Sequence, residues 1–174
     1  AMAVDGDPAT AWKVGVDVLC FGGTKNGMAV GEAVVFFKRE LAQEFAYRCK
    51  QSGQLASKMR YLAAPWVGML ESGAWLRNAR HANASAARLE SRLAEIPGTR
   101  FLSHRQANSV FLDLPPHALA EVRARGWRFY TFIGDSGARF MCSWDTTDAD
   151  IDALAHDLRD ILTAPLDSVA GGTP

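Results

Sequence analysis

A lysine that follows two glycines offers the clearest chemistry in this sequence. The segment reads Asp17-Val-Leu-Cys-Phe-Gly-Gly-Thr-Lys-Asn-Gly27, so Lys25 stands just beyond an apolar run. Glycine permits positive φ and lets another group approach the backbone closely. An ammonium that loses hydration there is easier to deprotonate, and its amine can then form a Schiff base with an aldehyde. From local composition alone, a solvated turn lysine remains the alternative interpretation.

Two apolar runs flank this lysine. Val14 to Phe21 predicts a strand buried on both faces, with its end inside the protein, and Met28 to Phe37 predicts a second strand. The expected arrangement is strand, tight loop, strand, with Lys25 near the bend. The phosphate-binding spacing Gly-x-x-x-x-Gly-Lys-[Ser/Thr] is absent, so we do not expect nucleoside triphosphate binding.

Composition narrows the class of protein. With 174 residues, of which 48% are hydrophobic and 22% charged, the chain can bury a core. Because 19 basic residues balance 19 acidic ones, and no basic block is interleaved with aromatics, we expect no nucleic-acid partner. No apolar run long enough for a membrane span and no signal segment occurs, so we expect no membrane partner and a cytoplasmic location.

The cysteines and histidines do not form a recognisable site. Cys20, Cys49 and Cys142 are odd in number and widely spaced, which argues against a disulfide framework or a zinc site, and we interpret Cys20 and Cys142 as buried structural thiols. The histidines lack metal-ligand spacing and are interpreted as surface or capping residues, so no metal is expected.

Beyond the lysine loop, hydrophobic periodicity predicts alternating helices and strands. The last helix begins at Thr147, where Thr-x-x-Asp150 suits a capping box, and carries apolar residues on one face. Pro65 is expected to open a long helix that Pro97-Gly98 ends. The predicted helices are 38–50, 55–64, 66–95, 117–125 and one starting at 147, and the predicted strands are 101–102, 109–114 and 138–143.

Longer segments carry a family resemblance. Trp12-Lys-Val-Gly-Val-Asp-Val-Leu-Cys-Phe-Gly-Gly-Thr-Lys-Asn-Gly27, followed by Gly31-Glu-Ala-Val-Val-Phe36, closely resembles the lysine segment of low-specificity L-threonine aldolases, including the phenylserine aldolases. These are pyridoxal-phosphate enzymes of the aspartate-aminotransferase fold type, or fold type I. The resemblance continues, in the family's order, through 54–66 and 106–111 to 139–145.

The resemblance implies an α/β fold, the C-terminal part of a fold-type I enzyme. Residues 1–70 would be the C-terminal part of the large cofactor-binding domain, with the Schiff-base lysine loop. Residues 71–164 would form a long linking helix and an α+β small domain, and 165–174 a loose tail. Family members are roughly twice this length, so an N-terminal half of the same enzyme is an implied partner.

The resemblance also implies roles for single residues. Lys25 would hold pyridoxal phosphate as a Schiff base, with Gly23 and Thr24 beside the cofactor. Arg139 would bind the substrate carboxylate, as the alternative to a solvated strand end. Lys50 and Lys58 would reach the cofactor phosphate of the neighbouring subunit, with solvated helix positions as the alternative. Arg60 is a close rival of Lys58 for that role.

The implied reaction is aldol cleavage of a β-hydroxy-α-amino acid, of the L-threonine, L-allo-threonine or phenylserine type, to glycine and an aldehyde. A homodimer or homotetramer is implied as well. Two alternatives stay open: a non-catalytic C-terminal fragment that acts only in folding or dimerisation, and a related β-eliminating lyase or glycine hydroxymethyltransferase on the same scaffold.

Overall fold

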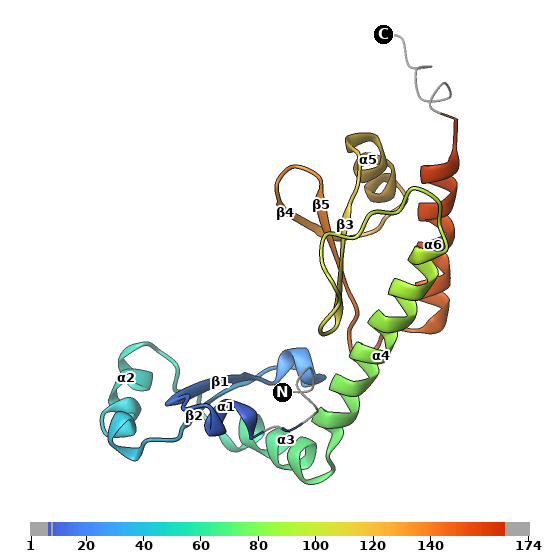
Figure 1. The fold of residues 1–174 in the computed structure, drawn as a ribbon. Coiled ribbons are helices and arrows are strands. Elements are labelled where there is room, and N and C mark those ends of the chain that lie inside the picture. The colour runs from blue at the N-terminus through green and yellow to red at the C-terminus, as the bar shows by residue number, and fades with distance from the viewer. Residues whose placement is uncertain (1–6, 8, 166–174) are drawn as a thin grey trace. The chain divides into compact units, whose positions relative to one another are not determined.

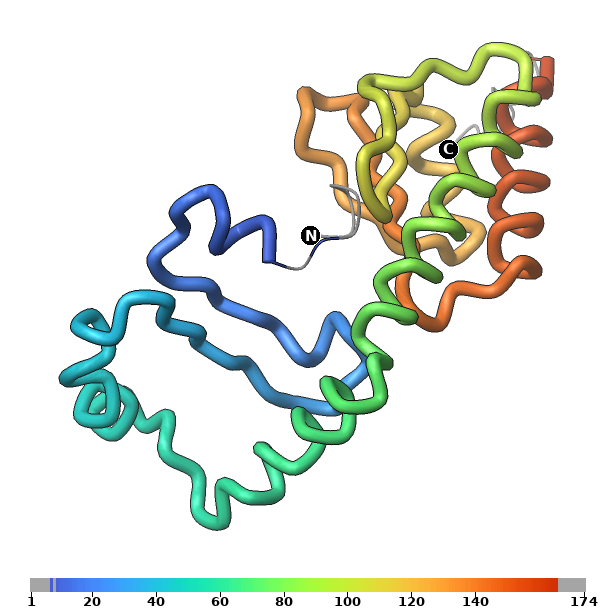
Figure 2. The backbone as a smooth tube through the Cα atoms, turned by 60° about the horizontal axis from the view of Figure 1, so that its bottom comes forward, coloured from blue at the N-terminus to red at the C-terminus, as the bar shows by residue number. Residues whose placement is uncertain are grey.

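The chain forms two compact units, residues 1–80 and 81–174. We describe them from a computed structural model that covers residue 7 and residues 9–165. Figure 1 shows the order of the elements and Figure 2 the course of the backbone. The division into domains at residues 70 and 71 stays a prediction, and residues 166–174 of the predicted tail lie outside the described part.

The first unit is built around a β-hairpin. Its two strands pair antiparallel, from Val18 opposite Phe36 to Gly22 opposite Glu32, and the lysine segment is the connection between them. The predicted order of strand, loop and strand is therefore confirmed. The elements of this unit are α1 (Thr10–Lys13), β1 (Val18–Gly22), η1 (Thr24–Asn26), β2 (Glu32–Phe36), η2 (Arg39–Ala42), α2 (Phe45–Gln51) and α3 (Arg60–Glu71). The next helix, α4 (Ala74–Ala94), contains the boundary between the two units.

The prediction that the first strand is buried on both faces is wrong for this chain. Val18 is 37% exposed, Cys20 is exposed, and no residue of β1 is fully buried. The sheet has two strands, and large aromatic rings reach it at Phe21, which lies 5.3 Å from Trp66 and 5.5 Å from Trp75 between ring centroids. An apolar run is buried only where other elements cover it.

The predicted helices of this unit need correction. Pro65 lies inside α3 and does not open a helix, and the break falls at Gly73, whose φ of +68° is a conformation that glycine adopts easily. The predicted helix 38–50 is divided into the 3₁₀ turn η2 and the shorter α2, because Glu44 between them leaves the helical region with φ −103° and ψ 6°.

The second unit is an antiparallel sheet with helices on one face. Its strand order is β3-β5-β4, and β4 was not among the predicted strands. Phe101 adds an isolated bridge to Leu112, where a short strand was predicted. The elements are β3 (Ser109–Asp113), α5 (Pro116–Ala124), β4 (Tyr130–Ile133), β5 (Gly137–Met141) and α6 (Asp148–Thr163).

The core of the second unit lies on one face of this sheet. Alternate residues of the strands, such as Val110, Leu112 and Phe140, are buried against α4, α5 and α6. Figures 1 and 2 show α4 and α6 running side by side. The residues between them in sequence, including Phe111 and Arg139, point to the opposite face.

The predicted capping box of the last helix is confirmed. The backbone N–H of Asp150 donates to Thr147 Oγ1 at 3.2 Å, and Asp150 Oδ2 accepts from the backbone N–H of Thr147 at 2.8 Å. The Thr147 hydroxyl also donates to Asp150 Oδ2 at 2.7 Å, and this bond, together with the one from the Thr147 backbone N–H, holds the pKa of Asp150 below its usual value. The predicted apolar face is also confirmed, because Ile151, Leu154, Leu158 and Ile161 are buried. None of the helices in the described range is long and apolar enough to cross a membrane.

This core predicts a local difference in stability along α6. Leu158 is 0% exposed, so Leu158→Ala should lower the free energy of unfolding by about 2–5 kcal/mol. His156→Ala on the exposed side of the same helix should change it by less than about 0.5 kcal/mol. Urea unfolding followed by circular dichroism measures both, and equal effects would contradict this assignment of the core.

Candidate active site

The loop that carries Lys25 is held by its own backbone. The N–H of Gly23 donates to the carbonyl of Gly31 at 2.9 Å, and the carbonyl of Gly23 accepts from the N–H groups of Asn26 at 2.9 Å and Met28 at 3.1 Å. Gly27 ends η1 with φ 98°, a left-handed conformation. Lys25 therefore lies in a turn whose backbone is hydrogen-bonded on both sides of the lysine.

Gly23 lies where no side chain fits. A Cβ atom there would be 2.7 Å from the Gly31 carbonyl oxygen, 2.7 Å from Met28 Sδ and 2.9 Å from the Trp66 ring. All three distances are shorter than ordinary van der Waals contacts. The second glycine of the pair therefore lets the loop pack against α3, which is the close approach that the sequence predicts.

Two asparagines fix the loop further, and sequence reasoning did not identify them as positioning residues. The side-chain amide of Asn26 donates to the carbonyl of Gly22 at 2.6 Å. The side-chain amide of Asn78, on α4, donates to the carbonyl of Asn26 at 2.6 Å. Since Asn78 is 52 residues away in sequence, no local pattern indicates its partner.

The Lys25 side chain is exposed, which corrects the expectation that it is buried and loses hydration. Within the described residues it has no ion pair or hydrogen bond of its side chain. Thr24 is exposed next to it. The turn therefore presents an unengaged amine and a hydroxyl from adjacent positions.

Lys50 and Lys58 are not brought to this turn by any contact. Lys50 lies near the end of α2, and both side chains are exposed without an ion pair among the described residues. Lys58 has φ 58°, the one positive value outside glycine in the described chain. Arg60, the first residue of α3, lies over the ring of Tyr61 at 4.9 Å. Their assignment to a cofactor phosphate stays a prediction.

Arg139 lies in the second unit, on the sheet face opposite the core. Its guanidinium carbon is 5.4 Å from the centre of the Phe132 ring and 5.7 Å from that of Tyr130. Its Nε is buried without a hydrogen-bond partner, and within the described residues no carboxylate pairs with it. By contrast, Arg88, Arg105 and Arg125 of this unit all form ion pairs. The guanidinium is therefore free to bind an anion.

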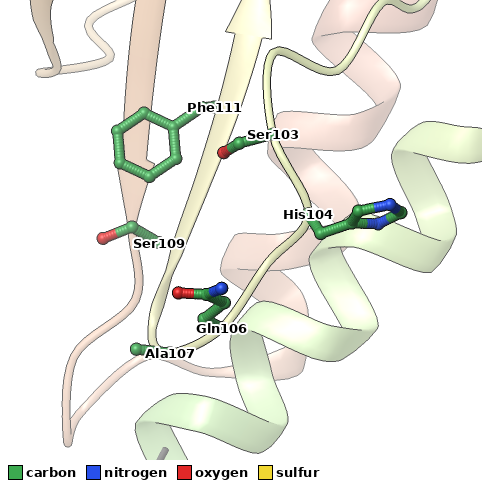
Figure 3. A pocket seen from close by; sticks show the side chains of 6 residues that line it. All are labelled: Ser103, His104, Gln106, Ala107, Ser109 and Phe111. Carbon is green, nitrogen blue, oxygen red and sulfur yellow. The ribbon is translucent and has the colours of Figure 1, made fainter.

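A cavity of about 470 Å³ opens next to this face and was not anticipated from the sequence. Figure 3 shows that its lining comes from the segment before β3, including Ser103 and Gln106, and from β3 itself. Phe111 of this lining pairs across the sheet with Arg139 and packs edge-on against Phe132, with ring centroids 6.0 Å apart. Polar and aromatic groups thus lie close to the unpaired arginine.

The three thiols are free, and they differ in environment. Cys142 is buried, as predicted, and burial raises its pKa to about 11. Cys20 is exposed, so its interpretation as a buried thiol is wrong: it lies on the face of β1 opposite Phe21, on which the rings of Trp66 and Trp75 pack. In the part of the chain that the structure describes, no three His, Cys, Asp or Glu residues are grouped so that they could hold a metal ion.

Comparison with protein families shows which family the chain belongs to. A model of the beta-eliminating lyase family matches residues 1–115, which include the hairpin and the lysine loop. The chain belongs to this family. The match ends just after β3, so it does not extend to Arg139.

Individual relatives agree with this. The chain is 63% identical over 153 residues to a low-specificity L-threonine aldolase of a Pseudomonas species, and 62% identical over 154 residues to one of Pseudomonas aeruginosa. Each alignment covers 88% of this chain and 44% of the relative. The chain thus spans less than half the length of these curated relatives.

Solved structures show the fold. A threonine aldolase of Leishmania major aligns with a TM-score of 0.74 and 24% identity, over 84% of this chain and 44% of that one. A glycine decarboxylase (P-protein) of the glycine cleavage system aligns with a TM-score of 0.50 and 22% identity, over 83% of this chain and 35% of the other. The mixed α/β architecture is therefore that of part of a fold-type I enzyme, as the resemblance implied.

The packing around Gly23 predicts the effect of a single methyl group. Gly23→Ala should destabilise the first unit by about 1–3 kcal/mol, because the added carbon meets backbone and ring atoms. Gly68→Ala on α3 is the control: its added carbon meets nothing within 4 Å, so it should be neutral or stabilise by up to about 1 kcal/mol. Thermal unfolding compares them, and equal midpoints would contradict the close approach.

The cysteine environments predict different reactivity. Cys20 should react with iodoacetamide at mildly alkaline pH, and Cys142 should react at least roughly tenfold more slowly, because the neutral, buried thiol is a poor nucleophile. Peptide mass spectrometry of the folded chain measures both rates. In denaturant the difference should disappear. Equal rates in the folded chain would show that Cys142 is accessible.

Proposed function

We propose that the complete protein catalyses pyridoxal-phosphate-dependent aldol cleavage of a β-hydroxy-α-amino acid, of the L-threonine, L-allo-threonine or phenylserine type, to glycine and an aldehyde. The observation that carries the proposal is the unengaged amine of Lys25 on a loop fixed by Gly23, Asn26 and Asn78. The names of the two Pseudomonas relatives support the choice of reaction.

The residues present suit a cofactor that is both an aldehyde and a phosphate ester. Lys25 has an amine that no carboxylate engages in the described chain, which a bond to an aldehyde requires. Gly23 fixes the turn that carries this amine, and Thr24 offers a hydroxyl for hydrogen bonding. When bound, pyridoxal phosphate supplies an electron-accepting ring that stabilises the negative charge left at Cα after the Cα–Cβ bond breaks.

Arg139 would bind and orient the substrate. A guanidinium and a carboxylate can form two parallel hydrogen bonds, which fix the direction of the amino acid. The rings of Tyr130 and Phe132 restrict where the guanidinium can turn and shield one side of it from water. Because the group is held before the substrate arrives, binding loses less side-chain freedom.

Other parts of the proposal rest on the resemblance alone. Lys50 and Lys58 would bind the cofactor phosphate across a subunit interface in a homodimer or homotetramer. Their exposure and lack of ion pairs are compatible with such a role. A cytoplasmic location is part of the same proposal. No residue of this chain is proposed as the base that takes the proton of the β-hydroxyl.

A second candidate reaction is β-elimination, which the name of the matched family favours. It needs the same cofactor and the same lysine and differs in the bond that breaks. The products separate the two reactions, because elimination yields ammonia and a keto acid where aldol cleavage yields glycine and an aldehyde.

The test uses the complete protein loaded with pyridoxal phosphate. With L-threonine we expect glycine and acetaldehyde, and Lys25→Ala should abolish both the product and the absorbance of the lysine-bound cofactor. Arg139→Gln should raise the KM for threonine roughly tenfold to hundredfold, since a charge-assisted contact contributes about 1.5–3 kcal/mol. The control is Arg159→Gln on α6. Arg159 is exposed and has only a long ion-pair contact to Glu95 at 3.9 Å, so this change should leave the KM, the products and the cofactor absorbance as they are.

Three outcomes would overturn the proposal. Ammonia and a keto acid as the main products would assign the protein to β-elimination. Full activity in Lys25→Ala would remove the lysine from the mechanism. Absence of both reactions in the complete, cofactor-loaded protein would favour the non-catalytic alternative.

A further inference from the structure

A second cavity in the 81–174 unit has no role in the proposed reaction. It is an open hollow of about 270 Å³ between the end of β5, the segment before β4 and the start of α6, and neither Lys25 nor Arg139 lines it. This volume is near the lower end of the range for small-molecule sites, which begins at roughly 300 Å³. It suits one small metabolite better than a nucleotide or a peptide.

The floor of this cavity is apolar. Leu89, Phe140, Ile151 and Leu154 line it, and each is at most 6% exposed. Cys142 also lines it, and burial keeps this thiol neutral by raising its pKa to about 11. A hydrocarbon side chain placed here would leave water without giving up any hydrogen bond.

Trp127 forms a fixed wall of the cavity. Its indole N–H donates to Asp157 Oδ2 at 2.7 Å, and the other carboxylate oxygen of Asp157 accepts from Arg125 at 2.7 Å. The polar edge of the indole is therefore satisfied, and Asp157, which is itself bonded to Arg125, holds the ring in place. The remaining ring surface is available for an apolar contact.

Two opposite charges line the cavity without pairing. Arg128 and Asp145 both belong to its lining, and neither forms an ion pair or a side-chain hydrogen bond with another described residue. Nearby charges of this unit do pair, for example Arg88 with Asp148 at 2.7 Å. The carboxylate of Asp150, a third charged group of the lining, is already bonded to Thr147.

We propose that this cavity binds a free apolar α-amino acid. Arg128 would bind its carboxylate, Asp145 its ammonium group, and the floor beside Trp127 its side chain. A zwitterion with a hydrocarbon side chain matches each of these features, whereas an inorganic anion would leave Asp145 and the floor unmatched. The proposal is independent of the aldolase reaction, since it uses none of the residues assigned to that reaction.

Binding is measured on the 174-residue chain by isothermal titration calorimetry with L-leucine and L-phenylalanine. We expect saturable binding of both and a change in fluorescence that is lost in Trp127→Phe. Leucine methyl ester lacks the carboxylate and N-acetyl-leucine lacks the ammonium group, so each should bind at least about tenfold more weakly. Glycine lacks the side chain and should bind more weakly too.

Matched variants locate the site. Arg128→Gln and Asp145→Asn should each weaken L-leucine binding about tenfold or more. Arg80→Gln and Asp135→Asn change exposed charges outside the cavity and should leave binding unchanged. Arg139→Gln should also leave it unchanged, which separates this cavity from the proposed substrate site. Circular dichroism shows whether each variant is folded.

The proposal is wrong if neither amino acid binds to the wild-type chain. It is also wrong if the methyl ester and the acetylated form bind as well as leucine, a result that needs no variant. Binding that Arg139→Gln removes and Arg128→Gln leaves intact would place the ligand at the other site. An aldolase assay that fails leaves these results unaffected, because the calorimetry needs no turnover.

Discussion

The position of the turn that carries Lys25 depends on residue 23 being a glycine. The backbone at Gly23 approaches the Gly31 carbonyl, Met28 and the Trp66 ring so closely that a methyl group would not fit. This contact joins the two ends of the hairpin to α3, and Trp66 in turn packs on Phe21 of β1. The position of the lysine backbone is therefore set by packing two residues earlier, while its long side chain is left free in solvent.

A different constraint acts on Arg139. The sheet of the second unit has helices on one face only, and the alternation of strand residues puts Phe140 in the core and Arg139 on the opposite face. An arginine can keep an unpaired, partly desolvated guanidinium there, because Tyr130 and Phe132 beside it offer ring faces instead of carboxylates. The one-sided core stabilises the unit, and the other face remains available for binding.

Patterns that are completed within a few residues could be predicted from the sequence. Thr147 and Asp150 form the capping box of α6, and the apolar face of that helix is buried as its spacing indicates. Features that depend on distant partners could not. The contact of Asn78 with Asn26 spans 52 residues. Cys20 looks buried by composition, and it is exposed because Trp66 and Trp75 pack at Phe21, on the other face of β1.

The exposure of the hairpin bears directly on the proposed chemistry. The large buried cluster of the described residues belongs to the second unit, whereas the lysine turn is held by hydrogen bonds and a few aromatic contacts. Removing an amine from water favours its neutral form, which is the form that attacks an aldehyde. The loop supplies the geometry for Lys25 and not the desolvation. The turn is therefore preformed within the described chain, and the proposed function leaves the covering of Lys25 to residues outside it.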